Sequence, residues 1–208
     1  WFVKSQSSVR FAENRRRSIL PSFSLKAGEL PSTLRYIGDF AFNATKLEMN
    51  QLVIPEGVEE INQYAFAFCR KLKAQVTLPS TIKKIGEWAF YGCPITSINL
   101  PEGLESLGSL SFWDCDLREV SIPSSCHEFN EGWQFGFNRN LEKMHLPEGM
   151  TEIPDHFAVD CFRLREVNFP HTLKHIGEKA FSLCISLKNV DLPLGMQSLG
   201  EEAFSELE

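Results

Sequence analysis

The stretch PSTIKKIGEWAFYGCPITSINL, residues 79–100, decides the fold because the rest of the chain repeats it with substitutions. Its pattern is P-x-x-(L/I/V)-x-x-I-G-x-x-A-F-x-x-C, followed by one or two residues, a Leu or Ile, and a closing V-x-L triplet. The prolines that begin the copies are 22 to 24 residues apart and stand at positions 31, 55, 79, 101, 123, 147, 170 and 193. A fixed period of this length predicts a solenoid, in which each copy buries its apolar side against its neighbours.

The repeats place residues 31–208 in one elongated domain of seven complete copies and an eighth that is cut short after Phe204. Residues 1–30 do not follow the pattern. Their apolar side chains predict an N-terminal cap over the first copy, and a linker from an upstream domain is the alternative. Because the chain does not begin with Met and its last copy is incomplete, we expect a fragment of a longer protein or the product of signal removal.

Each copy is expected to contain a short strand, a second extended piece and a tight turn. The closing triplet alternates apolar, outward and apolar residues, as in a strand with one buried face. The second piece has apolar residues three apart and usually ends at Gly, where we expect positive φ. The x-x-A-F-x-x-C segment predicts one helical or 3-10 turn. The triplets are Leu52-Val53-Ile54, Val76-Thr77-Leu78, Ile98-Asn99-Leu100, Val120-Ser121-Ile122, Met144-His145-Leu146, Val167-Asn168-Phe169 and Val190-Asp191-Leu192.

The phenylalanine of the A-F pair predicts an internal column of aromatic rings, because equal positions of a solenoid lie above one another. The sixth copy inverts the pair to Phe157-Ala158, and the fifth carries one extra residue near Trp133. The column would contain Phe42, Phe66, Phe90, Phe112, Phe135, Phe181 and Phe204.

The repeat resembles the BspA-like type of leucine-rich repeat, most clearly in IGEWAFYGC at 85–93 and IGEKAFSLC at 176–184. The resemblance covers residues 31–208 and implies an α/β leucine-rich-repeat solenoid, a right-handed superhelix of short parallel strands joined by short helical or 3-10 turns. It also implies a non-catalytic protein-binding or adhesion module of a bacterial secreted or cell-surface protein. The partner would be a protein ligand, such as a host or extracellular-matrix protein. The alternative is an architectural spacer array that carries other domains.

Composition and motifs exclude several other classes. The net charge of -6 argues against a nucleic-acid partner, which would favour a basic surface. No apolar run approaches the roughly 20 residues that span a bilayer. Nucleophile-elbow, phosphate-loop and dinucleotide fingerprints do not occur, so we expect no enzyme and no cofactor.

The six cysteines are interpreted as buried thiols, because five occupy the same repeat position and none forms a C-x-x-C pair. Cysteines of neighbouring copies, such as Cys69 and Cys93, leave disulfides as an alternative and a metal site as a weaker one. The five histidines fall at outward or turn positions of different copies, which argues against a zinc site.

Two outward stripes are candidate binding surfaces. The first consists of aromatic residues just before or after the A-F or S-F pair in the N-terminal half: Phe40, Tyr64, Trp88, Tyr91 and Trp113, with Leu110 beside them. The alternative is that these rings pack flat over neighbouring turns. The second stripe follows the outward centres of the triplets, with Asn99, Ser121, His145 and Asn168 as candidates. Its alternative is an ordinary solvated sheet face.

Overall fold

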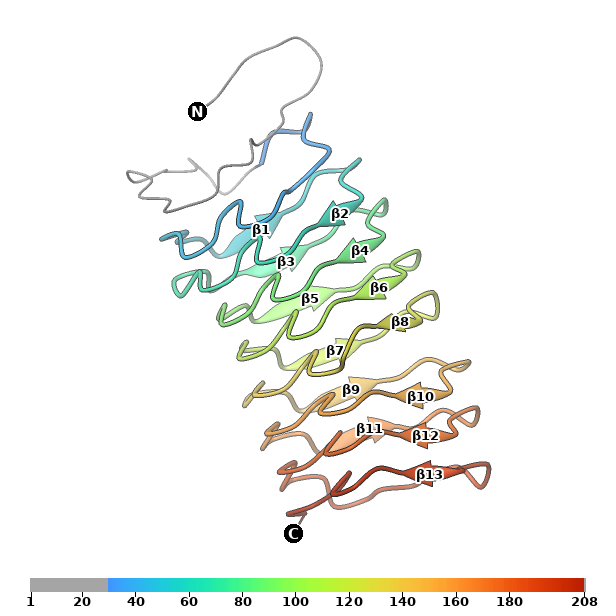
Figure 1. Ribbon diagram of the computed structural model, residues 1–208. Coiled ribbons are helices and arrows are strands. Elements are labelled where there is room, and N and C mark those ends of the chain that lie inside the picture. The colour runs from blue at the N-terminus through green and yellow to red at the C-terminus, as the bar shows by residue number, and fades with distance from the viewer. Residues whose placement is uncertain (1–29, 208) are drawn as a thin grey trace.

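The computed structural model describes residues 30–207, and the structural statements below concern this part of the chain. Figure 1 shows flat turns stacked along one axis, with a strand on each of two sides. One side carries three-residue strands: β1 (Gln51–Val53), β3 (Gln75–Thr77), β5 (Ser97–Asn99), β7 (Glu119–Ser121), β9 (Lys143–His145) and β11 (Glu166–Asn168). The other side carries two-residue strands: β2 (Glu60–Ile61), β4 (Lys84–Ile85), β6 (Ser106–Leu107), β8 (Glu128–Phe129), β10 (Glu152–Ile153), β12 (His175–Ile176) and β13 (Ser198–Leu199).

All strand pairs are parallel, which confirms the predicted parallel-strand solenoid. The sheets have the orders β1-β3-β5, β7-β9-β11, β2-β4-β6-β8 and β10-β12-β13. Leu52 pairs with Val76 and Val76 with Ile98, so one buried residue of each strand lies above the next. The triplet at 190–192, expected to continue this series, is not a strand.

The expected helical or 3-10 turns are wrong: no residue between 30 and 207 is helical. The segment instead forms consecutive β-turns whose N–H groups alternate in direction. In the second copy, the N–H groups of Tyr64, Phe66 and Phe68 donate to carbonyls of the third copy at 2.7–2.9 Å. Those of Ala65 and Ala67 close turns onto carbonyls three residues earlier. Stacking therefore satisfies half of the groups that a helix would have satisfied internally.

Positive φ occurs at a different place from the one expected. The glycines that end the second extended piece do not adopt it; the residue directly before the A-F pair does, with φ of 56° at both Tyr64 and Trp88. Glycine is instead required by close approach of the preceding copy. A Cβ at Gly108 would lie 2.4 Å from the backbone nitrogen of Glu87, and one at Gly86 would lie 2.8 Å from the carbonyl carbon of Asn62.

The phenylalanine column forms the centre of the core. Ring centroids of Phe66 and Phe90 are 5.1 Å apart and those of Phe90 and Phe112 are 5.6 Å apart, with the planes within 6° of parallel. In the sixth copy Phe157 stands at the alanine position, and its ring meets Phe135 edge-on at 78°. The inverted pair therefore keeps the column filled with a perpendicular ring in place of a stacked one.

The shared cysteine position supplies a hydrogen-bond donor as well as a small side chain. The thiols of Cys69, Cys93 and Cys115 donate to the carbonyl of the core phenylalanine in the preceding copy at 2.9–3.3 Å. Where the position is not Cys, Thr45 and Asn138 donate to a core phenylalanine carbonyl at 2.7 Å. All six cysteines are buried and free, so the interpretation as buried thiols holds and the disulfide alternative is wrong for this structure.

The proline loops join the copies in pairs. The Glu102 carboxylate accepts hydrogen bonds from the backbone N–H and the hydroxyl of Ser124, at 3.1 and 3.0 Å. Glu56 makes the same two contacts with Ser80. The loops read P-E-G and P-S-(T/S) in alternation here. One copy therefore provides the accepting carboxylate, and the next copy provides the donating serine.

Candidate functional site

The aromatic residues before the A-F pair form a continuous stack on the outside of the β-turns. Phe40 and Tyr64 are stacked at 4.8 Å and Tyr64 and Trp88 at 5.2 Å. Tyr91 lies 4.3 Å from Trp88 and meets Phe68 edge-on at 5.1 Å. The structure thus brings together four of the five candidate aromatics. The rings of Phe40, Tyr64 and Trp88 also lie nearly parallel to one another.

Trp113, the fifth candidate, belongs to a second aromatic group further along the stack. Its ring lies 4.6 Å from Phe137 and 5.3 Å from Trp133, and Trp133 stacks on His156 at 3.7 Å. We call the two groups together the aromatic face: Phe40, Tyr64, Phe68, Trp88, Tyr91, Trp113, Trp133 and Phe137.

Sequence reasoning missed three members of this face. Phe68 and Phe137 directly precede the shared Cys or Asn position and also adopt positive φ, 60° and 58°. Trp133 was noted only for the extra residue beside it, although it stands directly before Gln134-Phe135 and corresponds to Trp88. Aligning the copies at both outward turn positions would have found all three.

Arginines border the aromatic face. The Arg70 guanidinium lies 5.6 Å from the ring centre of Phe68 and pairs with Asp114 at 2.9 Å. Arg139 lies 5.7 Å from the ring centre of Phe137. Arginine over an aromatic ring is stabilised by the ring quadrupole and keeps its N–H groups available at the surface. Within the aromatic face the most exposed rings are Phe40 at 54% and Phe68 at 37%.

The strand face is polar, and two of its four candidates already have partners within the protein. Asn168 donates to the carbonyl of Leu146 and accepts from its N–H, both at 2.9 Å, so it extends the sheet with its side chain. His145 Nε2 lies 3.1 Å from the Glu119 carboxylate. Asn99 and Ser121 are exposed at the last positions of β5 and β7. This face offers a partner short polar groups and no concentrated apolar area.

Most of the described cysteine thiols have a raised pKa, and Cys69 is an exception, because hydrogen bonds with Cys93 and Thr45 lower its pKa. Burial raises the pKa of the Cys184 thiol to about 12 and also raises those of Cys115 and Cys161. These thiols therefore remain protonated, and the thiolate is the nucleophilic form. No cluster of three or more His, Cys, Asp or Glu side chains that could hold a metal ion occurs within residues 30–207. The same residues contain no helix long and apolar enough to cross a membrane.

Comparison with protein families identifies the repeat independently. The family model described as the BspA type leucine-rich repeat region matches residues 19–115, 74–170 and 156–208. No curated protein sequence matches the chain.

Solved structures show the same fold. A leucine-rich repeat protein of Treponema pallidum is 30% identical, with 72% of each chain covered and a TM-score of 0.64. A leucine-rich repeat protein of Eubacterium ventriosum is 19% identical over 84% of this chain and 74% of its own, with a TM-score of 0.55.

A protein of Faecalibacterium prausnitzii described as a leucine-rich cell surface protein is 22% identical, with a TM-score of 0.50. The alignment covers 86% of this chain and 63% of that one, so this chain spans less than two thirds of its length. The matched repeats extend over most of the sequence, and the chain belongs to the BspA-type leucine-rich repeat family.

Proposed function

We propose that this chain is a non-catalytic protein-binding or adhesion module of a secreted or cell-surface protein, and that the aromatic face contacts the partner. The family's repeats are typically non-catalytic, and a related fold belongs to a bacterial cell-surface protein. The partner class is an extracellular protein, such as one of a host surface or matrix. The observation that carries the proposal is a set of partly exposed Trp, Tyr and Phe side chains bordered by arginines.

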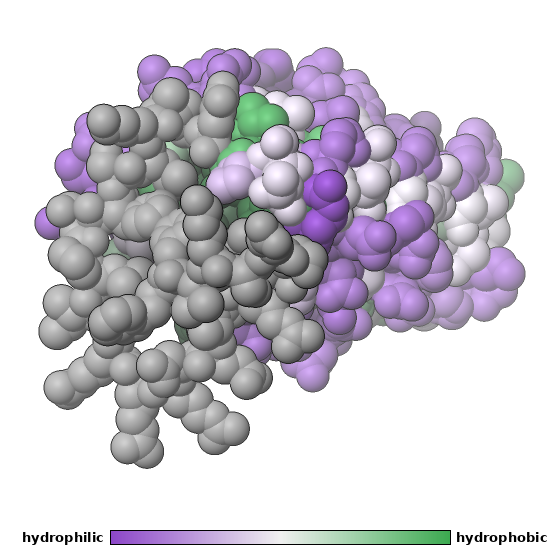
Figure 2. Space-filling view, turned by 90° about the horizontal axis from the view of Figure 1, so that it is seen from above, coloured by the Kyte–Doolittle hydropathy of each residue, from purple (hydrophilic) through white to green (hydrophobic). Residues whose placement is uncertain are grey.

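The chemistry of the aromatic face fits a protein partner. Trp, Tyr and Arg are the residues most often found as hot spots in protein interfaces. The stacked rings are already ordered by one another, so binding would immobilise few additional side chains and lose little conformational entropy. Figure 2, seen from above, shows a largely hydrophilic surface on this view, with apolar residues confined to small patches.

The aromatic face is favoured over the strand face as the main contact. Asn168 is occupied by the Leu146 peptide group and His145 by Glu119, which leaves Asn99 and Ser121 as the accessible candidates. Short polar side chains exchange hydrogen bonds with water for similar bonds with a partner, so each contributes little net affinity.

The second candidate function, an architectural spacer, is supported by the continuous phenylalanine column and the ladder of turn hydrogen bonds between copies. A spacer needs this rigidity but does not need exposed aromatic rings. Removing the outer rings while the core is left unchanged should therefore abolish binding in a partner-binding module and leave a spacer unaffected.

The test is a binding comparison with a variant designed for the backbone of the site. Tyr64→Asn/Trp88→Asn removes two rings, and Asn tolerates the positive φ at both positions better than most residues. Partners captured by the wild-type chain from host-cell and extracellular-matrix extracts would be identified, purified and titrated against both proteins. Asn99→Ala/Ser121→Ala is the matched control on the strand face.

We expect at least a tenfold loss of affinity in the aromatic variant and near-wild-type affinity in the control. The opposite ranking would assign binding to the strand face. Capture of no partner by the folded wild-type chain would favour the spacer.

A further inference from the structure

One side of the solenoid is interrupted between the fifth and sixth copies. The two-residue strands are hydrogen-bonded in the series β2-β4-β6-β8 and again in β10-β12-β13, but β8 and β10 are not paired. Figure 1 shows this gap as a wider separation between β8 and β10 than between β6 and β8. We call the space between them the slot.

The local cause is Pro154. The residue at this position in other copies donates its N–H to the preceding copy, as Gly86 does to Ile61 at 2.7 Å and Gly108 to Ile85 at 2.8 Å. Proline has no N–H, so the bond that would close β10 onto the Phe129 carbonyl is not available.

The fifth and sixth copies remain joined outside the slot. On the opposite side β9 of the fifth copy and β11 of the sixth are paired in register, with Met144 beside Val167. In the β-turns the N–H of Phe135 donates to the Phe157 carbonyl at 2.9 Å. The fifth and sixth copies are thus joined on both flanks of the slot, which makes it a fixed opening in a continuous solenoid.

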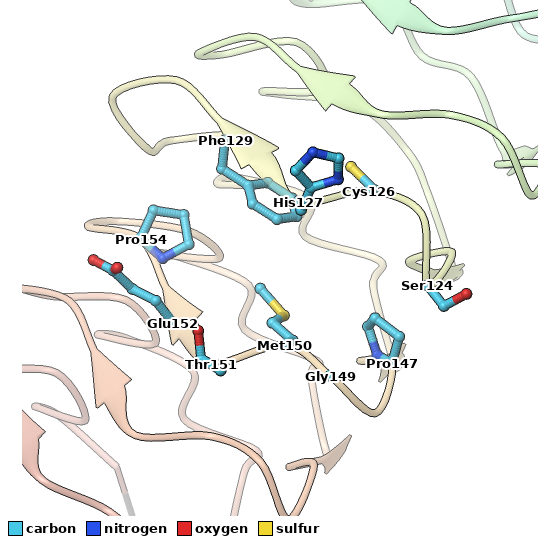
Figure 3. A pocket seen from close by; sticks show the side chains of 10 residues that line it. All are labelled: Ser124, Cys126, His127, Phe129, Pro147, Gly149, Met150, Thr151, Glu152 and Pro154. Carbon is cyan, nitrogen blue, oxygen red and sulfur yellow. The ribbon is translucent and has the colours of Figure 1, made fainter.

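The slot is a cavity of about 280 Å³ lined by both polar and apolar residues. Figure 3 shows Phe129 and Cys126 along the β8 wall and Met150 and Pro154 along the β10 wall. Phe129 is only half-buried, whereas the residues that correspond to it in neighbouring copies, such as Leu107 and Ile153, are fully buried. The interior therefore has the space and the chemistry to receive a further apolar side chain.

Main-chain groups on both walls have no main-chain partner in the described residues. In an intact pair, the N–H groups of Lys83 and Lys84 both donate to the Glu59 carbonyl, at 2.7 and 3.2 Å. The corresponding N–H groups of Thr151 and Glu152 and the carbonyl of His127 make no such bond. A donor edge and an acceptor edge thus face each other across a space too wide for direct pairing.

We propose that the slot binds an extended peptide segment of a partner protein, which inserts as a strand parallel to β8 and β10. A peptide main chain has the alternating donors and acceptors that both edges require, and strand addition to an open edge is an established mode of peptide recognition. The site lies on a different side from the aromatic face and does not depend on the function proposed for that face.

The walls also specify the inserted sequence. A central residue pointing inward would lie between Phe129 and Ile153, which favours Ile, Leu or Val. The residue before it points outward and lies between Glu128 and Glu152, both exposed and acidic, which favours Lys or Arg. The recognised element is therefore a basic residue followed by a branched aliphatic one in an extended segment.

The probe is a fluorescent peptide with the sequence IKKIGE, that of residues 82–87, because β4 pairs on both edges and carries Lys84 outward and Ile85 inward. Two control peptides are derived from this probe. In one, the second Lys is replaced by Glu; the other keeps the sequence but is methylated on the backbone nitrogens of the second Lys and second Ile. Binding to the wild-type chain would be followed by fluorescence anisotropy and mapped by backbone amide NMR.

Two protein variants complete the experiment. Pro154→Asn installs the arrangement at Asn62, whose backbone N–H and Nδ2 both lie 3.0 Å from the Ile37 carbonyl, and should close the slot. Tyr64→Asn/Trp88→Asn tests independence from the aromatic face. We expect saturable binding of the probe peptide, with NMR chemical-shift changes confined to the amides within residues 126–130 and 149–154. Binding should weaken at least tenfold with either control peptide or with Pro154→Asn, and should be unchanged in the aromatic variant.

Three results would overturn the proposal: no saturable binding at millimolar peptide, amide shifts located elsewhere, or equal affinity for the methylated peptide. A loss of binding in the aromatic variant would also count against a separate site. Thermal unfolding of each variant separates loss of the slot from loss of the fold.

Discussion

Phe90→Ala tests whether the solenoid depends on its central aromatic column. Phe90 is fully buried and has a parallel ring on each side, Phe66 at 5.1 Å and Phe112 at 5.6 Å. Alanine at this position would leave both neighbouring rings facing a cavity. Main-chain hydrogen bonds hold the third copy to both neighbours, so the cavity cannot close by a simple shift of the copies.

The expected loss is set by these contacts. Burial of a phenylalanine side chain contributes about 1.5–3 kcal/mol. Each stacked pair adds about 0.5–1.5 kcal/mol beyond burial, and Phe90 takes part in two. The sum agrees with the roughly 3–5 kcal/mol measured for core Phe→Ala substitutions in other proteins.

The measurement is urea unfolding followed by circular dichroism, with wild-type and variant compared at equal m-values. Phe40→Ala is the matched control, because Phe40 is 54% exposed and stacks on Tyr64 among the described rings. We expect the control to lose about 1 kcal/mol or less, since it forfeits one exposed stacking contact. A loss below about 1 kcal/mol for Phe90→Ala would refute the column as the main source of core stability.

Three further predictions concern the contacts between copies. Gly108→Ala should destabilise by about 1–3 kcal/mol because its Cβ would overlap the Glu87 backbone, while Gly195→Ala, with no atom within 4 Å, should change stability by less than about 0.5 kcal/mol in the same urea assay. Cys93→Val should lose about 0.5–1.5 kcal/mol because the Phe66 carbonyl loses its thiol donor and keeps only the Cys69 N–H, and Cys93→Thr should lose less; equal losses would show that only side-chain size matters. Hydrogen bonds from Ser124 lower the pKa of Glu102 below its ordinary value of 4.5, so the stability that this carboxylate contributes is present above pH 4.5 and is lost as the pH falls through the lowered pKa. The melting temperature should fall below pH 4.5, and the fall should be shallower in Glu102→Gln; parallel curves for the two proteins would contradict this assignment.

The repeat pattern predicted most of the core because burial in a solenoid is periodic. The apolar first and third residues of six triplets, the phenylalanine column and the cysteine position were all found by aligning the copies, and most of them are buried. The triplet at 190–192 fits the same pattern but is not a strand, so the apolar pattern alone does not decide which triplets pair.

The turn conformation could not be read from the pattern. An A-F pair followed by Cys is compatible with a helical turn, and the preference for consecutive β-turns comes from N–H groups that bond to the next copy. Positive φ was expected at the glycines because the sequence shows only that a side chain is absent there. It does not show whether the backbone torsion or a lack of space excludes a side chain. At Gly108 space excludes it.

The candidate aromatic residues were found from the sequence only in part. Four of them form one stack, whereas Trp113 belongs with Trp133 and Phe137, because the side-chain direction at each turn position decides which rings meet. That Asn168 bonds to the Leu146 peptide group likewise depends on the spacing between copies.

The sequence by itself determined that this chain is a solenoid, which residues form its interior and where each copy begins, since these depend on the period and on the separation of apolar and polar positions. Only the tertiary structure decided the directions of the peptide groups, the grouping of the surface rings and the opening between β8 and β10. Those features depend on hydrogen bonds and contacts between copies about 23 residues apart. At Pro154 the missing N–H removes one such bond while the apolar pattern at Met150 and Ile153 stays intact.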